Sequence, residues 1–406
     1  MRVGILTFHA QLNYGGVLQC WALKEALRRM GHTVVVVDRW LSETNSALKA
    51  PFVVWSVRQW VGCIARGMAG CRTWDRVVRH LRTMRFVRRL GLTPYHFCEW
   101  QDAPKDLGVD CLVVGSDQVW HGGDWGRPEP YLLFGAPPVR AISYAASFGM
   151  RTLPETHDYA TGFRCFEAIS VREVEGVELV RQTGYAGAVA HVVDPTLLLP
   201  REAWWRLAKR KRRPRRLVCY FLSEDIPSAV SILEPWAKQT GWTVEILCDG
   251  YSKVFPRNVR SLVARVGEMV RPSPVRLSLA AGPREFVRAF ARAEACVTDS
   301  FHAVMFSSIY DCNVRFLRPT HPQRKLMFTR IEGFAQTAVE GEMMADNLAS
   351  ALESIARGTR ISFRRDVIDS WRNASWHWLE AALRKNRAET PCVEASIREL
   401  AADCQC

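Results

Sequence analysis

The sequence predicts an α/β protein in which two doubly wound, Rossmann-like lobes face a cleft. Short apolar runs of the kind that form buried strands alternate with segments of helical spacing, and this alternation breaks at a basic run and then starts again. Continuous apolar runs are typical of parallel strands that helices cover on both faces. At 406 residues, the chain is long enough for two or three domains of ordinary size. We therefore expect one lobe on each side of the basic run.

The first lobe is expected over residues 1–208, and it opens with a complete strand–helix–strand unit. The apolar run VGILTF at 3–8 leads through a polar turn to apolar residues at helical spacing between Tyr14 and Met30. Gly31 ends this helix, and a second apolar run follows it. Such a unit is the repeating element of a parallel sheet. Further buried strands are expected at 111–115, 141–145, 168–171 and 191–193.

A helical insertion is expected at about 42–100, between the second and third strands. Within it, the segment from Lys49 to Arg89 interleaves Trp55, Trp60 and Trp74 with arginines. A basic helix with tryptophans at its edge can lie on an anionic membrane surface. A helix that packs its apolar face on its own domain has the same composition, so the sequence leaves both interpretations open.

The basic run KRKRRPRR at 209–216 is the densest cluster of charge in the chain. We interpret it as a solvated linker between the lobes, and the alternatives are a nuclear address or a nucleic-acid patch. The second lobe is expected over 217–364, and residues 365–406 should form a closing C-terminal helix and a tail. The expected elements of the second lobe are strands at 217–222, 243–248, 295–298 and 314–317 and helices at 228–239, 284–292 and 301–309.

The chain has a formal charge of +14, because 55 Lys plus Arg oppose 41 Asp plus Glu; 9 of the 55 are Lys, which leaves 46 Arg. Arg can bind carboxylate and phosphate groups through two hydrogen bonds at once, which suits an anionic ligand. A coding bias toward Arg would give the same count, so the net charge decides nothing. The basic residues are dispersed and no recognition motif accompanies them, so nucleic acid is not an expected partner.

The cysteines and the N-terminus indicate the compartment. Thirteen cysteines are scattered without Cys-x-x-Cys spacing, which is typical of reduced thiols rather than of a disulfide framework or a zinc site. The opening MRVGILTFHA lacks the features of a signal peptide. No window approaches the ~18 uninterrupted apolar residues of a membrane span. We expect a cytoplasmic protein without a metal site.

Polar side chains follow the strand expected at 295–298, and this segment points most directly to a function. Thr298, Asp299 and Ser300 end the strand, and His302 lies in the first turn of the next helix. In an open α/β sheet, ligands collect at the carboxyl ends of strands, where helix N-termini direct free N–H groups at anions. A histidine that only caps or packs at a helix start would occupy the same position, so that alternative stays open.

The strand expected at 111–115 ends in a similar turn, which contains Ser116 and Asp117. Ser and Asp are ordinary N-cap residues, but a carboxylate at a strand end that faces a cleft can also accept a proton from a substrate hydroxyl. Weaker polar turns occur at 13–16, 170–173 and 194–196. The absence of Gly-x-Gly-x-x-Gly, Walker, His-Glu-x-x-His, Gly-x-Ser-x-Gly and calcium-loop motifs argues against the common dinucleotide, NTPase, zinc-protease and hydrolase functions.

Six short segments follow one another in a fixed order. They are Asn13-Tyr14-Gly15 with Gln19, GSDQVW at 115–120, SYAASFG at 143–149, SVRE at 170–173, DPTLLL at 194–199 and TDSFH at 298–302. Their order and spacing resemble the polysaccharide pyruvyl transferases over roughly residues 1–330. The resemblance implies a two-lobed fold like that of GT-B glycosyltransferases. It also implies transfer of a pyruvyl group from phosphoenolpyruvate to two hydroxyls of a sugar, which forms a ketal and releases phosphate.

The resemblance further implies roles for individual residues. The histidine that matches His302 acts as the general acid that protonates the methylene carbon of phosphoenolpyruvate, a task that suits histidine because it titrates near neutrality. Asp117 is expected to activate an acceptor hydroxyl. The N-terminal lobe should hold the acceptor and the C-terminal lobe the donor. Contacts to the acceptor sugar are expected from Asn13, Tyr14, Ser116 and Gln118.

The expected donor site departs from the family at two positions. Where the family often has Arg-Leu-His, this chain has Ser-Phe-His at 300–302. Ser300 is therefore expected to contact the donor at the position where the family has an arginine. Ala303 replaces a frequent Gly and narrows the approach of the backbone to the donor. The trianionic donor must therefore find its cations elsewhere. The candidates are Arg172 and Arg324, which resemble family positions, and behind them Arg318 and Lys325.

Two other functions stay open. A GT-B nucleotide-sugar glycosyltransferase would need a carboxylate in the C-terminal lobe to hold the ribose, and none stands out in the sequence. A sugar- or anion-binding relative without catalysis would explain Ser300, whereas His302 and Asp117 favour an enzyme. Phosphoenolpyruvate is expected as a co-substrate and no cofactor is expected. A lipid-linked acceptor of exopolysaccharide or cell-envelope synthesis would bring the Trp- and Arg-rich segment near 52–76 to the inner face of the membrane.

Overall fold

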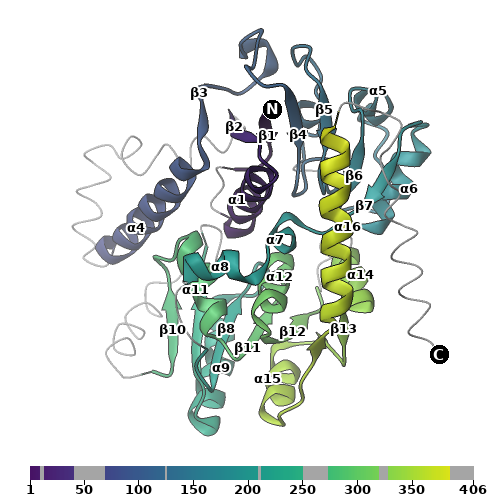
Figure 1. Ribbon diagram of the computed structural model, residues 1–406. Coiled ribbons are helices and arrows are strands. Elements are labelled where there is room, and N and C mark those ends of the chain that lie inside the picture. Colours follow the sequence, from purple (N-terminus) through teal and green to yellow (C-terminus); the bar gives the residue numbers. More distant parts are fainter. Residues whose placement is uncertain are drawn as a thin grey trace, which may run out of the picture.

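The computed structural model describes residues 1–9, 13–40, 69–123, 126–208, 212–249, 273–319 and 328–384. They form two α/β lobes, drawn one above the other in Figure 1, and each lobe has a parallel sheet at its centre. The predicted fold class is confirmed. None of the helices in these ranges combines the length and the apolar character that a membrane span requires.

The N-terminal lobe is built on a five-stranded sheet in the order β3-β2-β1-β4-β5, in which all neighbours are parallel. Its strands are β1 (Arg2–Leu6), β2 (Thr33–Arg39), β3 (Leu92–Phe97), β4 (Cys111–Val114) and β5 (Ala141–Ser143). A parallel pair, β6 (Ile169–Val171) and β7 (Val189–His191), continues beyond β5 through isolated bridges from Ile142 to Ala168 and from Ala146 to Val171. The strand expected at 191–193 therefore lies two residues earlier.

The helices of this lobe follow the strands in chain order. They are α1 (Tyr14–Arg29), α4 (Ala69–Val87), η1 (Arg88–Leu90), η2 (Trp100–Asp102), η3 (Glu129–Tyr131), α5 (Tyr159–Phe163), α6 (Val174–Gln182), α7 (Pro195–Leu198) and α8 (Arg201–Ala208). The first helix begins where Asn13 accepts a hydrogen bond from the Gly15 N–H at 2.9 Å, which satisfies an N–H that has no partner within the helix. Arg28 and Arg29 in its last turn complement the negative end of the helix dipole.

The helical insertion expected at about 42–100 needs a correction. Residues 42–68 lie outside the described part of the chain, and α4 is helical as expected. Residues 92–97, however, form β3, which pairs with β2 at the edge of the sheet. Pro94 makes this segment look unlike a strand, but an edge strand tolerates proline because one side of its backbone needs no ladder partner.

The C-terminal lobe has a six-stranded parallel sheet in the order β10-β9-β8-β11-β12-β14. Its strands are β8 (Arg216–Tyr220), β9 (Thr243–Leu247), β10 (Val275–Ser278), β11 (Ala295–Thr298), β12 (Asn313–Leu317) and β14 (Met344–Ala345), and an antiparallel pair joins β13 (Val339–Glu340) to β15 (Ser362–Phe363). The helices are α9 (Ile226–Thr240), α11 (Pro283–Arg292), α12 (Phe301–Tyr310), α14 (Thr329–Ala338), α15 (Leu348–Ala356) and α16 (Arg365–Leu383).

The basic run at 209–216 is only partly a solvated linker. Residues 209–211 lie outside the described part, and Arg216 is already the first residue of β8. Arg212 donates to the Tyr310 carbonyl at 2.6 Å, and the Arg213 N–H donates to the Arg292 carbonyl at 2.9 Å. The described end of the run is therefore attached to the C-terminal lobe.

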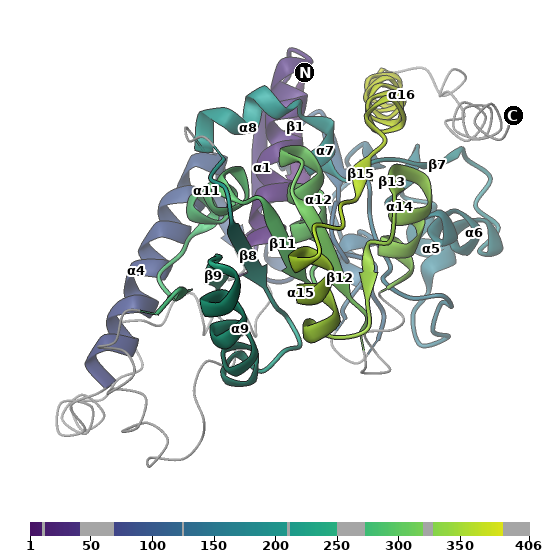
Figure 2. The same ribbon diagram turned by 90° about the horizontal axis from the view of Figure 1, so that it is seen from below.

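Two helices on opposite flanks join the lobes (Figure 1 and Figure 2). On one flank, Arg79 of α4 donates to the Leu279 carbonyl at 2.7 Å, and Arg82 donates to the Ala280 carbonyl at 2.7 Å. On the other flank, the hydroxyl of Ser375 in α16 accepts from the Val193 N–H at 3.0 Å. The described part of the Trp- and Arg-rich segment thus packs on its own protein.

The core continues from one lobe into the other through aromatic contacts. Tyr14 packs on Phe286 with ring centroids 5.0 Å apart, and Trp204 meets Phe306 at 4.8 Å. The fully buried Tyr14 hydroxyl donates across the interface to the Cys248 carbonyl at 2.7 Å. Burial raises the pKa of the Tyr14 phenol far above its usual value, so it stays a neutral donor.

Tyr14→Phe should weaken the attachment of the lobes, because it leaves a buried carbonyl without its donor. We expect the free energy of unfolding to fall by about 1–2 kcal/mol, measured by chemical denaturation. Tyr310→Phe is the matched control, because the buried Tyr310 hydroxyl has no hydrogen-bond partner among the described residues. Equal destabilisation by both substitutions would contradict the role of Tyr14.

Candidate functional site

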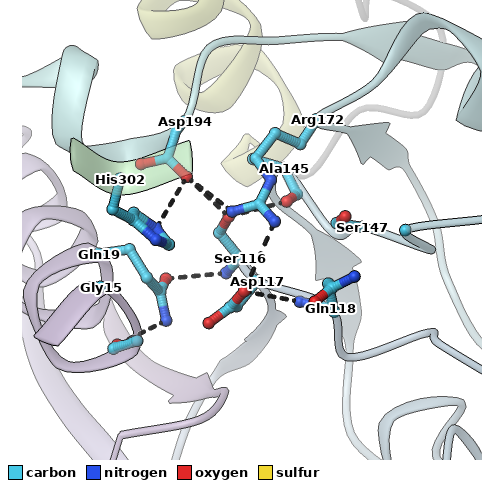
Figure 3. A network of polar contacts seen from close by, with 12 residues as sticks. Gly15, Gln19, Ser116, Asp117, Gln118, Ala145, Ser147, Arg172, Asp194 and His302 are labelled. Atoms are coloured by element: carbon cyan, nitrogen blue, oxygen red, sulfur yellow. Dashed lines mark hydrogen bonds and ion pairs between the residues drawn. The ribbon is translucent and has the colours of Figure 1, made fainter. Parts of the chain in front are cut away.

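The candidate site lies where strand ends of the N-terminal lobe face the N-terminus of α12 in the C-terminal lobe. Asp117 follows β4, Arg172 follows β6 and Asp194 follows β7. His302 is the second residue of α12. Figure 3 shows these four side chains turned toward one another, so residues nearly 200 positions apart in the sequence meet at one point.

Asp194 is the centre of this cluster. Its side chain is fully buried, and it caps α7 because its Oδ1 accepts from the Thr196 N–H at 2.9 Å and the Thr196 hydroxyl at 2.7 Å. Its Oδ2 accepts from Arg172 Nη1 at 3.0 Å and lies 3.7 Å from His302 Nε2. Burial by itself would raise the pKa of the Asp194 carboxyl, but His302, Arg172 and Thr196 outweigh burial and hold the pKa well below its usual range.

Arg172 links Asp194 to Asp117. Its Nη2 lies 3.5 Å from Asp117 Oδ1, and its guanidinium lies over the Phe301 ring at 4.5 Å from the centroid. Burial acts to lower the pKa of the Arg172 guanidinium, but the carboxylates of Asp194, Asp117 and Glu173 raise it above its usual value. Arg172 is therefore a permanent cation that fixes both aspartates.

The turn that presents Asp117 depends on an unusual backbone. Gly115 has φ of 110°, and a Cβ there would lie 2.5 Å from the Tyr144 carbonyl oxygen, so only glycine fits. Asp117 itself has φ of 74°, a conformation that costs energy for a residue with a side chain and that concentrates at functional sites. Gln19 of α1 supports the turn, because its Oε1 accepts from the Ser116 N–H at 3.2 Å.

His302 is held between the two lobes. A Cβ on Gly15 would lie 2.0 Å from His302 Nδ1, so the first turn of α1 touches the imidazole directly. On the other side, Nε2 faces Asp194 at a distance longer than a hydrogen bond. The buried Nε2 has no hydrogen-bond partner among the described residues. The ring is thus fixed by packing while one nitrogen is available to a ligand.

His302 and Asp117 line the same cavity, which we call the first cavity. Asn13, Gln118, Ser300 and Arg330 line it as well. Ser300 is the N-cap of α12 and does not use its side chain as a cap, so the first N–H groups of this helix lie at the cavity.

Arg330, in α14, is a cation that the sequence analysis did not identify. It is buried, and its guanidinium lies 5.4 Å from the centroid of Phe301. Burial and the neighbouring charge of Arg172 lower the pKa of Arg330 to about 10, so it remains charged at neutral pH. The only sequence signal was indirect, since Ser300 implied that a cation must come from elsewhere.

The predicted site residues fall into three groups. The structure brings most of them together around the first cavity and its walls: Asn13, Ser116, Asp117, Gln118, Arg172, Ser300 and His302. Tyr14 and Arg318 do not line the first cavity. The Tyr14 hydroxyl lies in the lobe interface, and Arg318 is half exposed and pairs with Asp346 at 3.4 Å. Arg324 and Lys325 lie outside the described residues.

In the sequence, Asp194 belongs only to a weak polar turn, because a buried carboxylate that faces a histidine cannot be distinguished from an N-cap there. Within the described ranges, no group of three or more His, Cys, Asp or Glu side chains could hold a metal ion.

A comparison with known families decides the assignment. The family described as polysaccharide pyruvyl transferase matches residues 13–321. The chain belongs to this family. The matched range contains Asp117, Arg172, Asp194 and His302, whereas Arg330 lies beyond its end, so the chain brings a cation to the site from outside the matched range. No curated protein matches the chain.

Among solved structures, the chain is similar to a UDP-GlcNAc 2-epimerase from Methanocaldococcus jannaschii, with a TM-score of 0.47 and 9% identity over 90% of this chain and 96% of that one. It is also similar to UGT89C1 from Arabidopsis thaliana, with a TM-score of 0.45 and 12% identity over 99% and 98% of the two chains. For the glycosyltransferase SnogD from Streptomyces nogalater, the TM-score is 0.37, with 12% identity over 99% of each chain. At TM-scores below 0.5, these likenesses decide nothing about activity.

Asp194→Asn should destabilise the protein, because it leaves the Arg172 guanidinium without its closest carboxylate. We expect the free energy of unfolding at pH 7 to fall by about 3 kcal/mol. The native pKa of Asp194 lies below the unfolded value of about 3.9, so the carboxylate stabilises the fold fully above that pH. This contribution decreases as the pH falls below about 3.9 and is lost as the pH falls through the lower native pKa, so the difference between wild type and variant should shrink over that range.

Urea denaturation at a series of pH values measures this difference. Asp158→Asn is the control, because Asp158 caps α5 from an exposed position and Asn caps equally well. A difference between wild type and Asp194→Asn that is the same at pH 7 and at pH 3 would contradict an ionised, paired Asp194.

Proposed function

We propose that this member of the polysaccharide pyruvyl transferase family uses phosphoenolpyruvate to place a pyruvyl ketal across two hydroxyls of a sugar. The observation that carries the proposal is the meeting of His302 from one lobe and Asp117 from the other at one cavity. Ketal formation needs a proton donor for carbon and a proton acceptor for a hydroxyl, and an imidazole and a carboxylate supply these two functions.

We place the donor at the N-terminus of α12. A phosphate there would meet the first N–H groups of the helix, a common anion-binding arrangement. Arg330 lines the same cavity and offers a planar cation that matches a carboxylate or a phosphate. Arg172 acts behind this surface, since Asp194 and Asp117 already occupy its guanidinium.

The reaction balances with these groups. A protonated His302 gives its proton to the methylene carbon of phosphoenolpyruvate, and the adjacent carbon becomes an oxocarbenium-like centre. The first sugar hydroxyl attacks this carbon while its proton passes to Asp117. The bond to phosphate then breaks, the second hydroxyl attacks the same carbon to close the ketal, and its proton leaves with the phosphate. Asp194 faces the imidazole, with its Oδ2 3.7 Å from His302 Nε2.

The full chain should release phosphate from phosphoenolpyruvate only when a suitable sugar acceptor is present, and the product should gain the mass of a pyruvyl ketal. His302→Gln should reduce turnover at least ~100-fold, because it removes the proton donor. His96→Gln, at an exposed position of β3, is the control and should keep wild-type turnover. Phosphate assays and mass spectrometry over a panel of acceptors measure both effects.

Two results would contradict this function. Near-normal turnover of His302→Gln would remove the proposed acid. Transfer from a nucleotide sugar without phosphate release from phosphoenolpyruvate would indicate a glycosyltransferase. Asp299 is the carboxylate of the C-terminal lobe that lines the first cavity, and its oxygens already accept the N–H groups of Leu222 and Ser223 at 2.6 and 2.7 Å. It is therefore poorly placed to hold a ribose.

Arg330→Gln should raise the KM for phosphoenolpyruvate by roughly 10-fold or more, because a hydrogen bond to a charged group is lost. The KM for the acceptor should change little. Arg318→Gln is the matched control, since Arg318 is half exposed and pairs with Asp346. If Arg318→Gln raises the KM for phosphoenolpyruvate and Arg330→Gln does not, the assignment of the donor cation is wrong.

We further propose that the reaction takes place in the cytoplasm on a precursor of an exopolysaccharide or cell-envelope polymer. The cysteines whose side chains the structure describes form no disulfide with one another, which supports a reducing compartment. A lipid-linked acceptor would bring the enzyme to the inner face of the membrane, and exposed arginines of α4 and η1, such as Arg85 and Arg89, would suit anionic headgroups there. Lipid-linked and free acceptors in the same panel distinguish these cases.

A further inference from the structure

A second cavity lies beside the first and shares two of its wall residues, Phe301 and Arg330. It is enclosed by the carboxyl ends of β6 and β7 in the N-terminal lobe and by α12, α14 and α16. Asp194 lines it as well, and Asp194 faces His302. The second cavity therefore adjoins the proposed reaction centre but is not needed for any step assigned above.

Three buried polar atoms without partners belong to residues that line the second cavity. They are Glu173 Oε2, Arg172 Nε and Trp371 Nε1, none of which has a hydrogen-bond partner among the described residues. The three residues are only 3%, 4% and 6% exposed. A buried donor or acceptor without a partner is costly. Two donors and one acceptor around one cavity therefore indicate a polar ligand that can both give and accept hydrogen bonds.

The charges around this cavity indicate a neutral ligand. Arg172 and Arg330 oppose Glu173, Glu175 and Asp194, so the wall offers no excess of positive charge. A trianion such as phosphoenolpyruvate would meet three carboxylates there, one more than at the first cavity, and it would lack the proton donor His302, which lines the first cavity alone. A polyhydroxylated, uncharged molecule meets no such penalty.

The remaining wall residues suit a sugar ring. Phe301, Phe334 and Trp371 provide apolar surface, and Gln336 and Thr337 of α14 add an amide and a hydroxyl. Trp371 packs on His191 with ring centroids 4.7 Å apart, which fixes the orientation of its indole. An apolar wall with a few oriented polar groups is the usual composition of a small-molecule site.

We propose that the second cavity binds a neutral sugar unit of the acceptor. Its link to the acceptor rests on the proposed function, whereas sugar binding at this cavity does not. The acceptor hydroxyls that react then lie beside Asp117, and the rest of the acceptor extends into the second cavity between the lobes. In this arrangement α14 provides Arg330 for the donor and Gln336 for the sugar.

The test measures binding of methyl glycosides of glucose, galactose and mannose to the full chain by saturation-transfer NMR, without phosphoenolpyruvate. At least one glycoside should bind with a millimolar Kd. Trp371→Phe keeps an aromatic ring and removes the N–H donor, and Gln336→Ala removes the amide. Each should raise the Kd about 3- to 10-fold, as the loss of one hydrogen bond requires.

Trp236→Phe is the matched control, because the buried Nε1 of Trp236 in α9 also has no partner among the described residues but Trp236 does not line either cavity. It should leave the Kd unchanged. If no glycoside binds up to 50 mM, or if the three variants bind alike, the inference is overturned.

Kinetics separate this inference from the proposed function. If both hold, Trp371→Phe and Gln336→Ala raise the KM for the acceptor and leave the KM for phosphoenolpyruvate unchanged. Glycoside binding that these variants weaken, without any turnover of phosphoenolpyruvate, would support the second cavity and overturn the proposed function. Normal turnover with an unchanged acceptor KM in both variants would overturn the role of the second cavity in acceptor binding and leave the proposed function intact.

Discussion

The buried carboxylate of Asp194 is the interaction on which the rest of the site depends. One oxygen caps α7 through Thr196, and the other meets Arg172 and faces His302. A carboxylate with these contacts cannot move without breaking a helix start, a buried ion pair and the lobe interface together. The price of burying this charge is offset by the surrounding donors, as the lowered pKa of Asp194 shows.

The two lobes are fixed to each other by contacts close to the same place. The first turn of α1 touches the His302 imidazole. Tyr14, the first residue of α1, donates a hydrogen bond to the Cys248 carbonyl in the C-terminal lobe. A histidine that belongs to one lobe is therefore positioned by the other. This arrangement explains why a small residue is needed at Gly15, since any side chain would displace the ring.

Ser300 stands where the family often has an arginine, and a cation from a different element lines the same cavity. Arg330 reaches the cavity from α14, and Phe301 lies within 6 Å of both its guanidinium and that of Arg172. Cations near an aromatic face are attracted by its π electrons, which helps to keep two like charges in one small volume. The larger ring at position 301, where the family often has Leu, thus fits the relocation of the cation.

The sequence by itself determined the two-lobed α/β fold, most strand positions and the segments that form the site. These features depend on local signals, namely apolar runs, capping residues and the polar turns at strand ends. It did not predict β3, because Pro94 is unusual in a strand and is tolerated there only at the sheet edge. It assigned Tyr14 to the acceptor, because the sequence does not show that the Tyr14 hydroxyl bonds to the other lobe. Only the tertiary structure decided that Asp194 faces His302, that Arg330 lines the first cavity and that a second cavity exists. Each of these depends on side chains from elements far apart in the chain, and the packing of the two lobes alone sets their distances.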